Sequence, residues 1–225
     1  MKIITLNCWL PLWSLDRKER LPFIFSALQK ESPDIIFLQE VFLKQDAKYL
    51  IEKLEEVGFK ESFHSKDLLF LSKYPIVSSE QRKLNNWGSF LVFGLLERQL
   101  KNVYQIIKVN IDEELITFVN LHLLGPYRNT KIYQETREKQ IQEICENFSA
   151  GQDKIIMGGD FNFDMNTPSY DIVTKYFHFN DTFIHTGAPT FSISNSNIKK
   201  YHFFKKMMQK ISNRGLTIFL YGDSK

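Results

Sequence analysis

Short apolar runs that end in polar residues recur along this chain of 225 residues. The runs have the length of β-strands, and none approaches the roughly 20 residues that a membrane-spanning helix needs. Segments with apolar residues at helical spacing lie between several of them. The strand candidates are residues 2–7, 35–41, 68–72, 89–96, 103–109, 115–120 and 154–157, and the helix candidates are residues 17–30, 45–57 and 131–148. This alternation predicts a layered α/β protein with mixed sheets.

Turn-forming residues support several of these boundaries. Residues 32–34 (Ser-Pro-Asp) follow the first helix candidate, and Gly58 follows the second. Residues 112–114 form a polar turn between two strand candidates. The run at 35–41 is apolar almost throughout, which is typical of a central strand buried on both faces.

Composition fits a globular protein and excludes several classes. Hydrophobic residues make up 43% of the chain and charged residues 24%, which argues against disorder. The net charge of +3 is too small to indicate a nucleic-acid-binding protein by itself. Cys8 and Cys145 lack the spacing of zinc ligands and cannot form a disulfide framework, so we expect buried thiols. No signal-peptide cleavage site or membrane span is seen, and we expect a cytoplasmic protein.

Polar side chains lie at the ends of four strand candidates, where open α/β sheets place ligand sites. Asn7, Glu40 and His122 close three of these strands, and Asp160 and Asn162 follow a fourth. Hard oxygen donors such as those of Asn7 and Glu40 suit Mg²⁺, which binds through few carboxylates together with substrate phosphate. Asp160 can orient a water or hold a metal, while His122 and Asn162 can donate hydrogen bonds to phosphoryl oxygens. Together they are the parts of a metal-assisted phosphodiester hydrolase.

Each of these residues also has a structural interpretation. Asn7 could be a turn residue, Glu40 the solvated end of a strand, and His122 a hydrogen-bonded core histidine. In a plain structural α/β domain, however, four polar strand ends would be aligned by coincidence. The chemical interpretation therefore depends on the order and spacing of the residues.

Five motifs carry a resemblance to a known family. They are LNCW at 6–9, PDIIFLQEV at 33–41, LSKYPI at 71–76, NLH at 120–122 and GDFN at 159–162. With these motifs, residues 1–195 resemble the endonuclease/exonuclease/phosphatase superfamily, the DNase-like metal-dependent phosphodiesterases. The second and fifth motifs, in this order, are the most specific.

The resemblance implies a four-layer α/β sandwich with two mixed β-sheets flanked by helices. It also implies a divalent metal, Mg²⁺ or, as the alternative, Mn²⁺. The implied roles are metal binding for Asn7 and Glu40, phosphate contact for His122 and Asn162, water orientation for Asp160, and support of the site for Asp181 and Thr190.

Within the superfamily, the sequence is most similar to the neutral sphingomyelinase branch. The residues at 7–9 and 39–42 fit that branch, as do Arg137 and Gln140 in the helix candidate at 131–148. We therefore expect a lipid-type or small phosphodiester as substrate. A DNA endonuclease or exonuclease of the same family is the alternative, so the partner is a lipid or a nucleic acid. A third hypothesis is a non-catalytic module that binds phosphate or a membrane.

Two closing motifs of the family are absent from the sequence. One is an Arg-Leu-Asp-Tyr-Ile-Phe strand, and the other is a Ser-Asp-His run whose histidine serves as general base. His178, His185 and His202 remain as candidates, and none lies in such a run. Because one missing motif is a strand, we expect the sandwich to be incomplete. Because a general base typically raises the reaction rate by about 10²–10⁴-fold, we also expect slow or no hydrolysis, together with weak Mg²⁺ binding.

Residues 196–225 form a basic tail that differs from the single domain expected over residues 1–195. Six basic residues and no acidic one lie between positions 197 and 222, so the remainder of the chain sums to +3 − 6 = −3. Phe203, Met207 and Ile211 have the spacing of an interfacial helix, which predicts peripheral contact with an anionic membrane. A frameshift or truncation is the other interpretation, because A/T-rich codons for residues 215–220 can encode the missing strand motif in the preceding frame.

Overall fold

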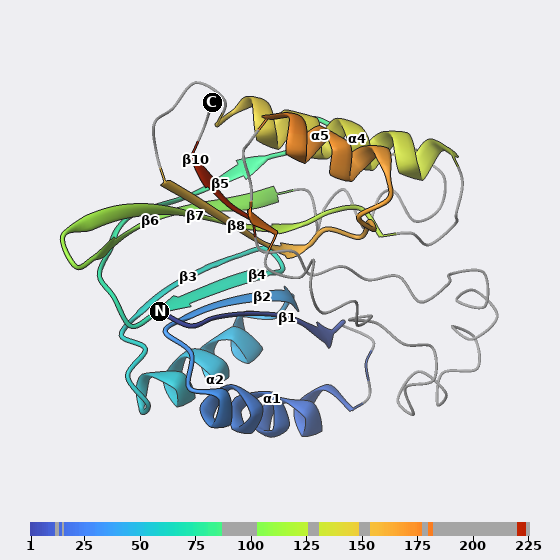
Figure 1. The fold of residues 1–225 in the computed structure, drawn as a ribbon. Helices are drawn as coiled ribbons and strands as arrows, with labels where there is room; N and C mark the ends of the chain where they lie inside the picture. Colours follow the sequence, from blue (N-terminus) through green and yellow to red (C-terminus); the bar gives the residue numbers. More distant parts are fainter. Residues whose placement is uncertain are drawn as a thin grey trace.

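The computed structural model describes residues 1–11, 14, 16–86, 103–125, 131–148, 154–176, 180–181 and 220–223. Its strands form two sheets that face each other, and helices cover the outer side of each sheet (Figure 1). The four-layer α/β sandwich predicted from the sequence is confirmed.

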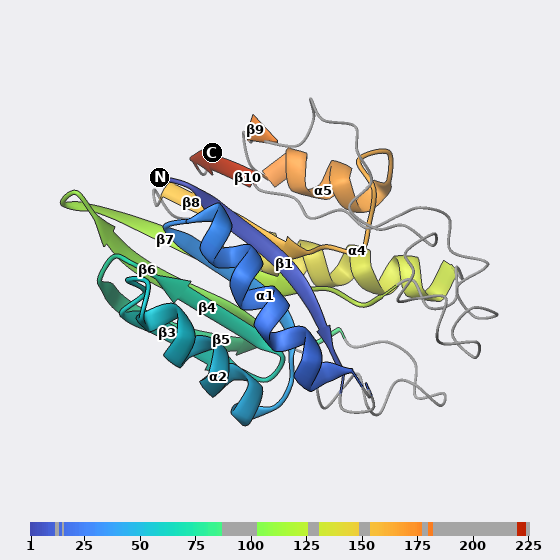
Figure 2. The ribbon, with the colours of Figure 1, turned by 90° about the horizontal axis from the view of Figure 1, so that it is seen from below.

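The first sheet has four strands in the order β1-β2-β4-β3. They are β1 (Ile3–Leu10), β2 (Ile35–Val41), β4 (Leu68–Ser72) and β3 (Glu61–Ser65). β1 and β2 run parallel and the other pairs are antiparallel, so the sheet is mixed. Helices α1 (Arg17–Glu31) and α2 (Lys44–Glu55) pack on its outer face, as Figure 2 shows from below.

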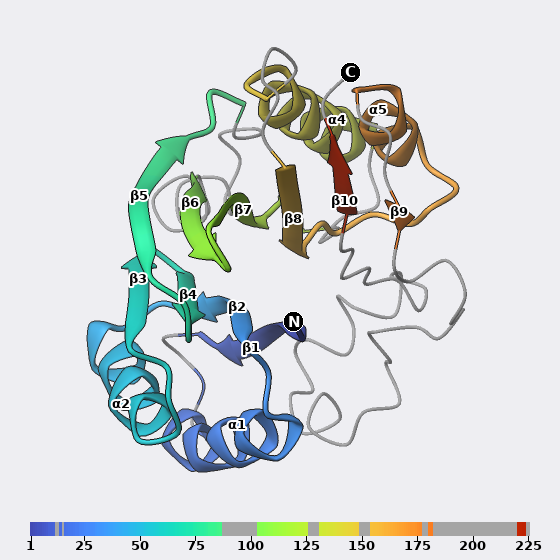
Figure 3. The same cartoon turned by 60° about the vertical axis from the view of Figure 1, so that its left-hand side comes forward.

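The second sheet has six strands in the order β5-β6-β7-β8-β10-β9. They are β5 (Ile76–Lys83), β6 (Val103–Ile111), β7 (Glu114–His122), β8 (Lys154–Asp160), β10 (Leu220–Asp223) and β9 (Asn180–Asp181). Only β7 and β8 run parallel. Helices α4 (Lys131–Glu146) and α5 (Pro168–Tyr176) lie on the side away from the first sheet, and Figure 3 shows the two sheets stacked face to face.

Three apolar clusters fill the spaces between the four layers. One lies between the first sheet and its helices, and a second between the second sheet and its helices. The third lies between the sheets and includes the rings of Phe37, Phe70 and Phe118, whose centroids are 5.4–6.0 Å apart. Burial of this apolar surface is the main force that holds the layers together.

The alternation of side chains along each strand decides what the space between the sheets contains. Side chains two residues apart lie on the same face of a strand. In β7, Ile116 and Phe118 belong to the cluster between the sheets, and the same face continues with Asn120 and His122. In β2 the same face carries Ile35 and Phe37 and continues with Gln39. The space between the sheets is therefore apolar in the middle and becomes polar at the ends of these strands.

Most predicted elements are present. The predicted strands at 35–41 and 68–72 coincide with β2 and β4, and the helix at 17–30 differs from α1 by one residue. The turn at 112–114 joins β6 to β7, with Asp112 and Glu113 in the left-handed region. The predicted strand at 89–96 lies outside the described residues.

Five elements were not predicted, namely β3, β5, α5, β9 and β10. β5 carries the sequence IVSSEQRK and is exposed along most of its length, so it lacks the apolar run that marks a strand. In the segment at 196–225, Leu220–Asp223 forms β10, which pairs with β8 and β9. The amphipathic spacing from 203 to 211 lies outside the described residues. Across the described part of the chain, no helix is long and apolar enough to cross a membrane.

Candidate active site

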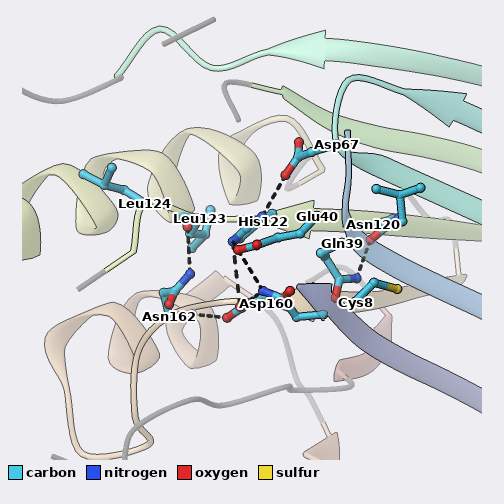
Figure 4. Close-up of polar contacts among 12 residues, drawn as sticks. Cys8, Gln39, Glu40, Asp67, Asn120, His122, Leu123, Leu124, Asp160 and Asn162 are labelled. Atoms are coloured by element: carbon cyan, nitrogen blue, oxygen red, sulfur yellow. Dashed lines mark hydrogen bonds and ion pairs between the residues drawn. The ribbon is translucent and has the colours of Figure 1, made fainter. Parts of the chain in front are cut away.

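The candidate site forms where strand ends from the two sheets meet. β1 and β2 run parallel, and so do β7 and β8, so the carboxyl ends of each pair lie at one edge of its sheet. Asn7 pairs with Gln39 in the first sheet, and His122 pairs with Asp160 in the second. Figure 4 shows the side chains of Glu40, His122 and Asp160 pointing toward one another.

Asn7 joins the two carboxylates of the site. Its Nδ2 lies 3.2 Å from Oε1 of Glu40 and 2.9 Å from Oδ2 of Asp160. Its Oδ1 accepts a hydrogen bond from the backbone N–H of Trp9, at 3.0 Å. One amide therefore links a carboxylate of the first sheet to a carboxylate of the second.

His122 faces the same two carboxylates from the inner side of the site. Its Nε2 lies 3.8 Å from Oε1 of Glu40 and 3.8 Å from Oδ2 of Asp160. Its Nδ1 lies 2.8 Å from Oδ2 of Asp67. With this carboxylate as acceptor, the ring carries a proton on Nδ1 and turns Nε2 toward the site.

Exposure increases across the site from the buried pair outward. The side chains of Asp67 and His122 are 0% and 1% exposed, whereas those of Glu40 and Asp160 are 9% and 17% exposed. Of these four side chains, those of Glu40 and Asp160 are thus the more accessible to solvent.

Asn162 is tied to the same strand ends. Its backbone N–H donates to Oδ1 of Asp160 at 3.1 Å, and its Nδ2 donates to the carbonyl of Leu123 at 2.9 Å. The first bond uses the Asp160 oxygen that faces away from Asn7. Asp160 is therefore held from both sides, by the amide of Asn7 and by the backbone of Asn162.

Three residues at these strand ends have backbone conformations that residues other than glycine rarely adopt. The φ angles are +50° for Trp9, +60° for Glu40 and +53° for Asn162. Such conformations persist only where the surrounding structure enforces them, and they gather at functional sites. In β2 the turn at Glu40 breaks the strand alternation and brings its side chain toward the space between the sheets.

Gly159 lets β8 approach β7 closely beside the site. A Cβ at this position would lie 2.0 Å from the carbonyl oxygen of Leu121, and its φ of +143° disfavours any other residue. The close approach brings Asp160 next to His122. The glycine of the GDFN motif is thus needed for the geometry of the site.

The donor set fits a hard divalent cation. Glu40 and Asp160 present carboxylate oxygens to one shared space, which is the chemistry that Mg²⁺ and Mn²⁺ prefer. Asn7 turns its nitrogen toward them, and a 180° turn of the amide would present its oxygen instead. Among the described residues, no three or more His, Cys, Asp and Glu side chains form a cluster with metal-site geometry. The fit therefore depends on two carboxylates and an amide, and leaves room for water and substrate oxygens.

The structure brings together five of the predicted site residues: Asn7, Glu40, His122, Asp160 and Asn162. Asp181 lies in β9, where it pairs with Leu220, and its side chain is outside the described part. Thr190 and the three C-terminal histidines lie outside the described residues. The roles assigned to all of these residues stay predictions.

Asp67 is a site residue that the sequence analysis missed. It lies in the tight turn between β3 and β4, where an aspartate normally faces solvent. Here its carboxylate is buried against His122, and its backbone carbonyl accepts a hydrogen bond from Val41, the residue after Glu40. The one available signal was the apolar strand that follows directly after the turn.

Residues near the site have supporting contacts. Burial raises the pKa of the Cys8 thiol far above its usual range, so it is a core thiol as predicted. Arg20 donates to the carbonyl of Cys8 at 3.0 Å and fixes the end of β1. Oε1 of Gln140 accepts a hydrogen bond from the backbone N–H of Leu124 at 3.0 Å, and Nη1 of Arg137 lies 3.4 Å from the carbonyl oxygen of Leu124. The helix α4 thereby holds the segment that follows His122.

Comparison of the sequence with family models identifies residues 4–200 as a match to the Endonuclease/Exonuclease/phosphatase family. The chain belongs to this family. The resemblance stated from the five motifs is confirmed.

Two curated proteins illustrate the similarity of this sequence to known enzymes. The chain is 27% identical over 195 residues to an inositol phosphosphingolipids phospholipase C from Schizosaccharomyces pombe, with 82% of this chain and 46% of the relative covered. It is 27% identical over 207 residues to sphingomyelin phosphodiesterase 2 from Homo sapiens, with 83% and 46% covered. The chain thus spans less than half the length of these relatives.

Solved structures share the fold at low sequence identity. A β-hairpin deletion mutant of beta toxin from Staphylococcus aureus has a TM-score of 0.77 at 14% identity, covering 99% of this chain and 86% of that chain. Sphingomyelinase C from Streptomyces griseocarneus has a TM-score of 0.76 at 15% identity, covering 99% and 83%. A third structure, a beta toxin mutant with bound magnesium ions, has a TM-score of 0.72 at 14% identity, covering 98% and 83%.

Proposed function

We propose that this member of the family is a metal-assisted phosphodiester hydrolase and that its substrate is a sphingolipid-type phosphodiester. The observation that carries the proposal is the meeting of Glu40 and Asp160 at one amide, that of Asn7, opposite the imidazole of His122. Two carboxylates beside a hydrogen-bond donor are the groups required to activate water and to bind a phosphoryl oxygen.

The side chains divide into two roles around the scissile phosphate. Asp160 accepts a proton from, and orients, the attacking water, because its carboxylate is the more exposed of the two. Asn162, and His122 in its doubly protonated form, donate hydrogen bonds to the phosphoryl oxygens on which negative charge grows in the transition state. Asp67 keeps the His122 ring turned toward the site and stabilises its positive charge when the ring is protonated.

Glu40 and Asn7 would hold the divalent cation, for which we propose Mg²⁺. Bound there, the ion would polarise the phosphoryl group and offset the charge of the pentacovalent transition state. Glu40 suits this role because its carboxylate reaches the same space as that of Asp160.

The proposal of a sphingolipid-type substrate is supported by the relatives at 27% identity, whose names specify inositol phosphosphingolipids and sphingomyelin. The net charge of +3 is too small to indicate binding to the phosphate backbone of a nucleic acid. Peripheral contact with a membrane and a cytoplasmic location remain part of the same proposal.

A substrate panel tests this function with the full chain. Sphingomyelin vesicles, inositol phosphosphingolipid vesicles, a nicked or abasic DNA duplex and inositol phosphates are incubated with Mg²⁺ or with EDTA, and phosphate-ester cleavage is measured. We expect Mg²⁺-dependent cleavage of the lipids, lost in Asp160→Ala and kept in the exposed α5 variant Asp171→Asn. Cleavage of DNA alone would assign the chain to the nucleases of the family. Vesicle binding without any cleavage would support the non-catalytic module.

We further propose that turnover is slow, because the sequence contains no Ser-Asp-His run to supply a second histidine. The proposed boundary between the domain and its tail, after residue 195, belongs to the same hypothesis. The nucleotide sequence around codons 192–225 tests the frameshift interpretation, which fails if the alternative frame encodes no Ser-Asp-His downstream. Rapid turnover by purified 1–225 would contradict the proposal of slow hydrolysis.

A further inference from the structure

Three buried amide side chains form a continuous hydrogen-bonded chain between the two sheets, next to the candidate site. They are Gln39 of β2, Asn120 of β7 and Gln105 of β6, and all three residues are 0% exposed. Each lies on the face of its strand that also carries the apolar cluster between the sheets. Gln39 immediately precedes Glu40, and Asn120 lies two residues before His122. The amide chain is therefore built from the same strands as the site.

The hydrogen bonds run in one direction along the chain. Nε2 of Gln39 donates to Oδ1 of Asn120 at 3.0 Å, and Nδ2 of Asn120 donates to Oε1 of Gln105 at 3.0 Å. Figure 4 shows the first of these bonds. Oδ1 of Asn120 and Oε1 of Gln105 each accept from the amide before them, and the Gln39 amide, the first in the chain, also pairs with the hydroxyl of Thr5. Reversing the Asn120 amide would break both of these bonds, so its two neighbours fix its orientation.

The chain ends on the turn that carries Asp67. Nε2 of Gln105 lies 2.9 Å from Oγ of Ser65 and 3.1 Å from the carbonyl of Leu68. It also lies 3.0 Å from the carbonyl of Phe63. Ser65 and Leu68 are paired across the turn, with Asp67 between them in the sequence. One amide group from the second sheet thus holds both sides of a turn in the first sheet.

This turn contacts both halves of the site. The carboxylate of Asp67 accepts from His122, while its backbone carbonyl accepts from Val41, next to Glu40. A shift of the turn would therefore change the orientation of the His122 ring relative to Glu40.

Apolar packing alone would not fix this geometry. The dispersion contacts among Phe37, Phe70 and Phe118 are individually weak, and the preference of the rings for tilted or edge-to-face pairs is worth only about 0.5–1.5 kcal/mol each. Buried hydrogen bonds are directional, and a satisfied polar network can specify one arrangement of a core.

We propose that Gln105 is a positioning residue: through Asn120 and the Asp67 turn, it sets the orientation of His122 relative to Glu40. The inference deepens the proposed function and rests on it, because the orientation of His122 matters for phosphate binding. Gln105 itself lies on the far side of Asn120 from Gln39 and acts only through other residues.

The ring nitrogens of His122 report on this role without any need for turnover. The full chain, free of metal and labelled with ¹⁵N-histidine, is studied by NMR at one fixed pH, where the nitrogen shifts give the populations of the two ring tautomers. The His122 signals are identified by their loss in His122→Asn. Gln105→Met keeps the length of the side chain but removes its hydrogen bonds. The matched control is Ile107→Val, a buried position two residues further along the same face of β6.

We expect a dominant Nδ1–H tautomer for His122 in the wild type and in Ile107→Val. Gln105→Met should increase the Nε2–H tautomer severalfold, in the same direction as Asp67→Asn, in which the carboxylate is lost directly. Wild-type His122 shifts in a folded Gln105→Met protein would overturn the proposal. If Gln105→Met does not fold, the milder Ser65→Ala variant is judged by the same criterion. Unchanged lipid cleavage in Asp160→Ala would contradict the proposed function alone, because the ring signals do not depend on hydrolysis.

Discussion

Oδ2 of Asp67 lies 2.8 Å from Nδ1 of His122, and the two residues come from different sheets. The contact joins the β3–β4 turn of the first sheet to the end of β7 in the second. Both side chains are almost fully buried. The pair therefore links the packing of the two sheets to the orientation of the His122 imidazole, which faces Glu40 and Asp160.

Replacement of Asp67 by Asn should reduce activity far more than stability. The amide keeps the shape of the side chain but removes the charge that stabilises a protonated His122. We expect hydrolysis to fall by about 10²–10³-fold, as for the loss of one donor to the transition state, while the midpoint of thermal unfolding changes little. Cleavage assays and circular dichroism measure the two effects. Equal activity of Asp67→Asn and the exposed-site control Asp171→Asn would rule out a role for the pair.

Replacement of Glu40 by Gln should weaken metal binding. The change keeps the side-chain size and removes one of the two carboxylates that face Asn7. Loss of affinity for Mn²⁺ should be at least the roughly 10–100-fold that removal of an outer-shell partner costs a metal site. Titration calorimetry with Mn²⁺ measures the change, with the exposed Glu55→Gln of α2 as control. Unaltered affinity would show that the ion, if bound, is held elsewhere.

Replacement of Gly159 by Ala should destabilise the fold. The new Cβ would meet the carbonyl oxygen of Leu121 at 2.0 Å, and the φ of +143° adds backbone strain. Overpacking and strain each cost about 1–3 kcal/mol, so we expect a clear loss in the free energy of unfolding, measured by urea titration. Gly58→Ala is the matched control, because Gly58 has a φ of +104° and no atom within 4 Å of an added Cβ. A loss no larger than that of the control would contradict the close approach of β7 and β8.

The pH dependence of stability should change when Asp46 is replaced by Asn. Burial raises the pKa of the Asp46 carboxyl, and its partner Arg17, 3.1 Å away, offsets this only in part. The folded chain therefore takes up the proton at higher pH than the unfolded chain does. As the pH falls from this raised pKa to the usual value, the wild type should gain stability relative to Asp46→Asn. Urea titrations of both proteins between pH 7 and about pH 4 measure the difference, and a relative loss of stability on acidification would be the contrary result.

The architecture could be predicted because its central strands are marked in the sequence by apolar runs. The run at 35–41 is buried at every position, and the runs that became β4, β7 and β8 are also mostly apolar. The edge strand β5 could not be found in this way, since it buries little and owes its structure to pairing with β6. Helix α5 is short, with nine residues, and a chain of that length has only a weak helical pattern.

The candidate site was predictable only in part. Asn7, Glu40, His122, Asp160 and Asn162 follow apolar runs, so their position at strand ends could be read from the sequence. Asp67 follows no such run, and its burial depends on how the two sheets stack. In the same way, the hydrogen bonds of Gln105 arise from the packing of β6 against the β3–β4 turn, which no local pattern encodes.

The place of β10 has a consequence for how the chain reaches its native state. β10 lies between β8 and β9, so among the described strands β9 is connected to the sheet through residues 220–223. During synthesis, β8 therefore leaves the ribosome well before the strand that covers its edge. An uncovered edge of this kind invites pairing with other chains. Expression yield should thus depend on events near codon 220, far from the residues that form the candidate site.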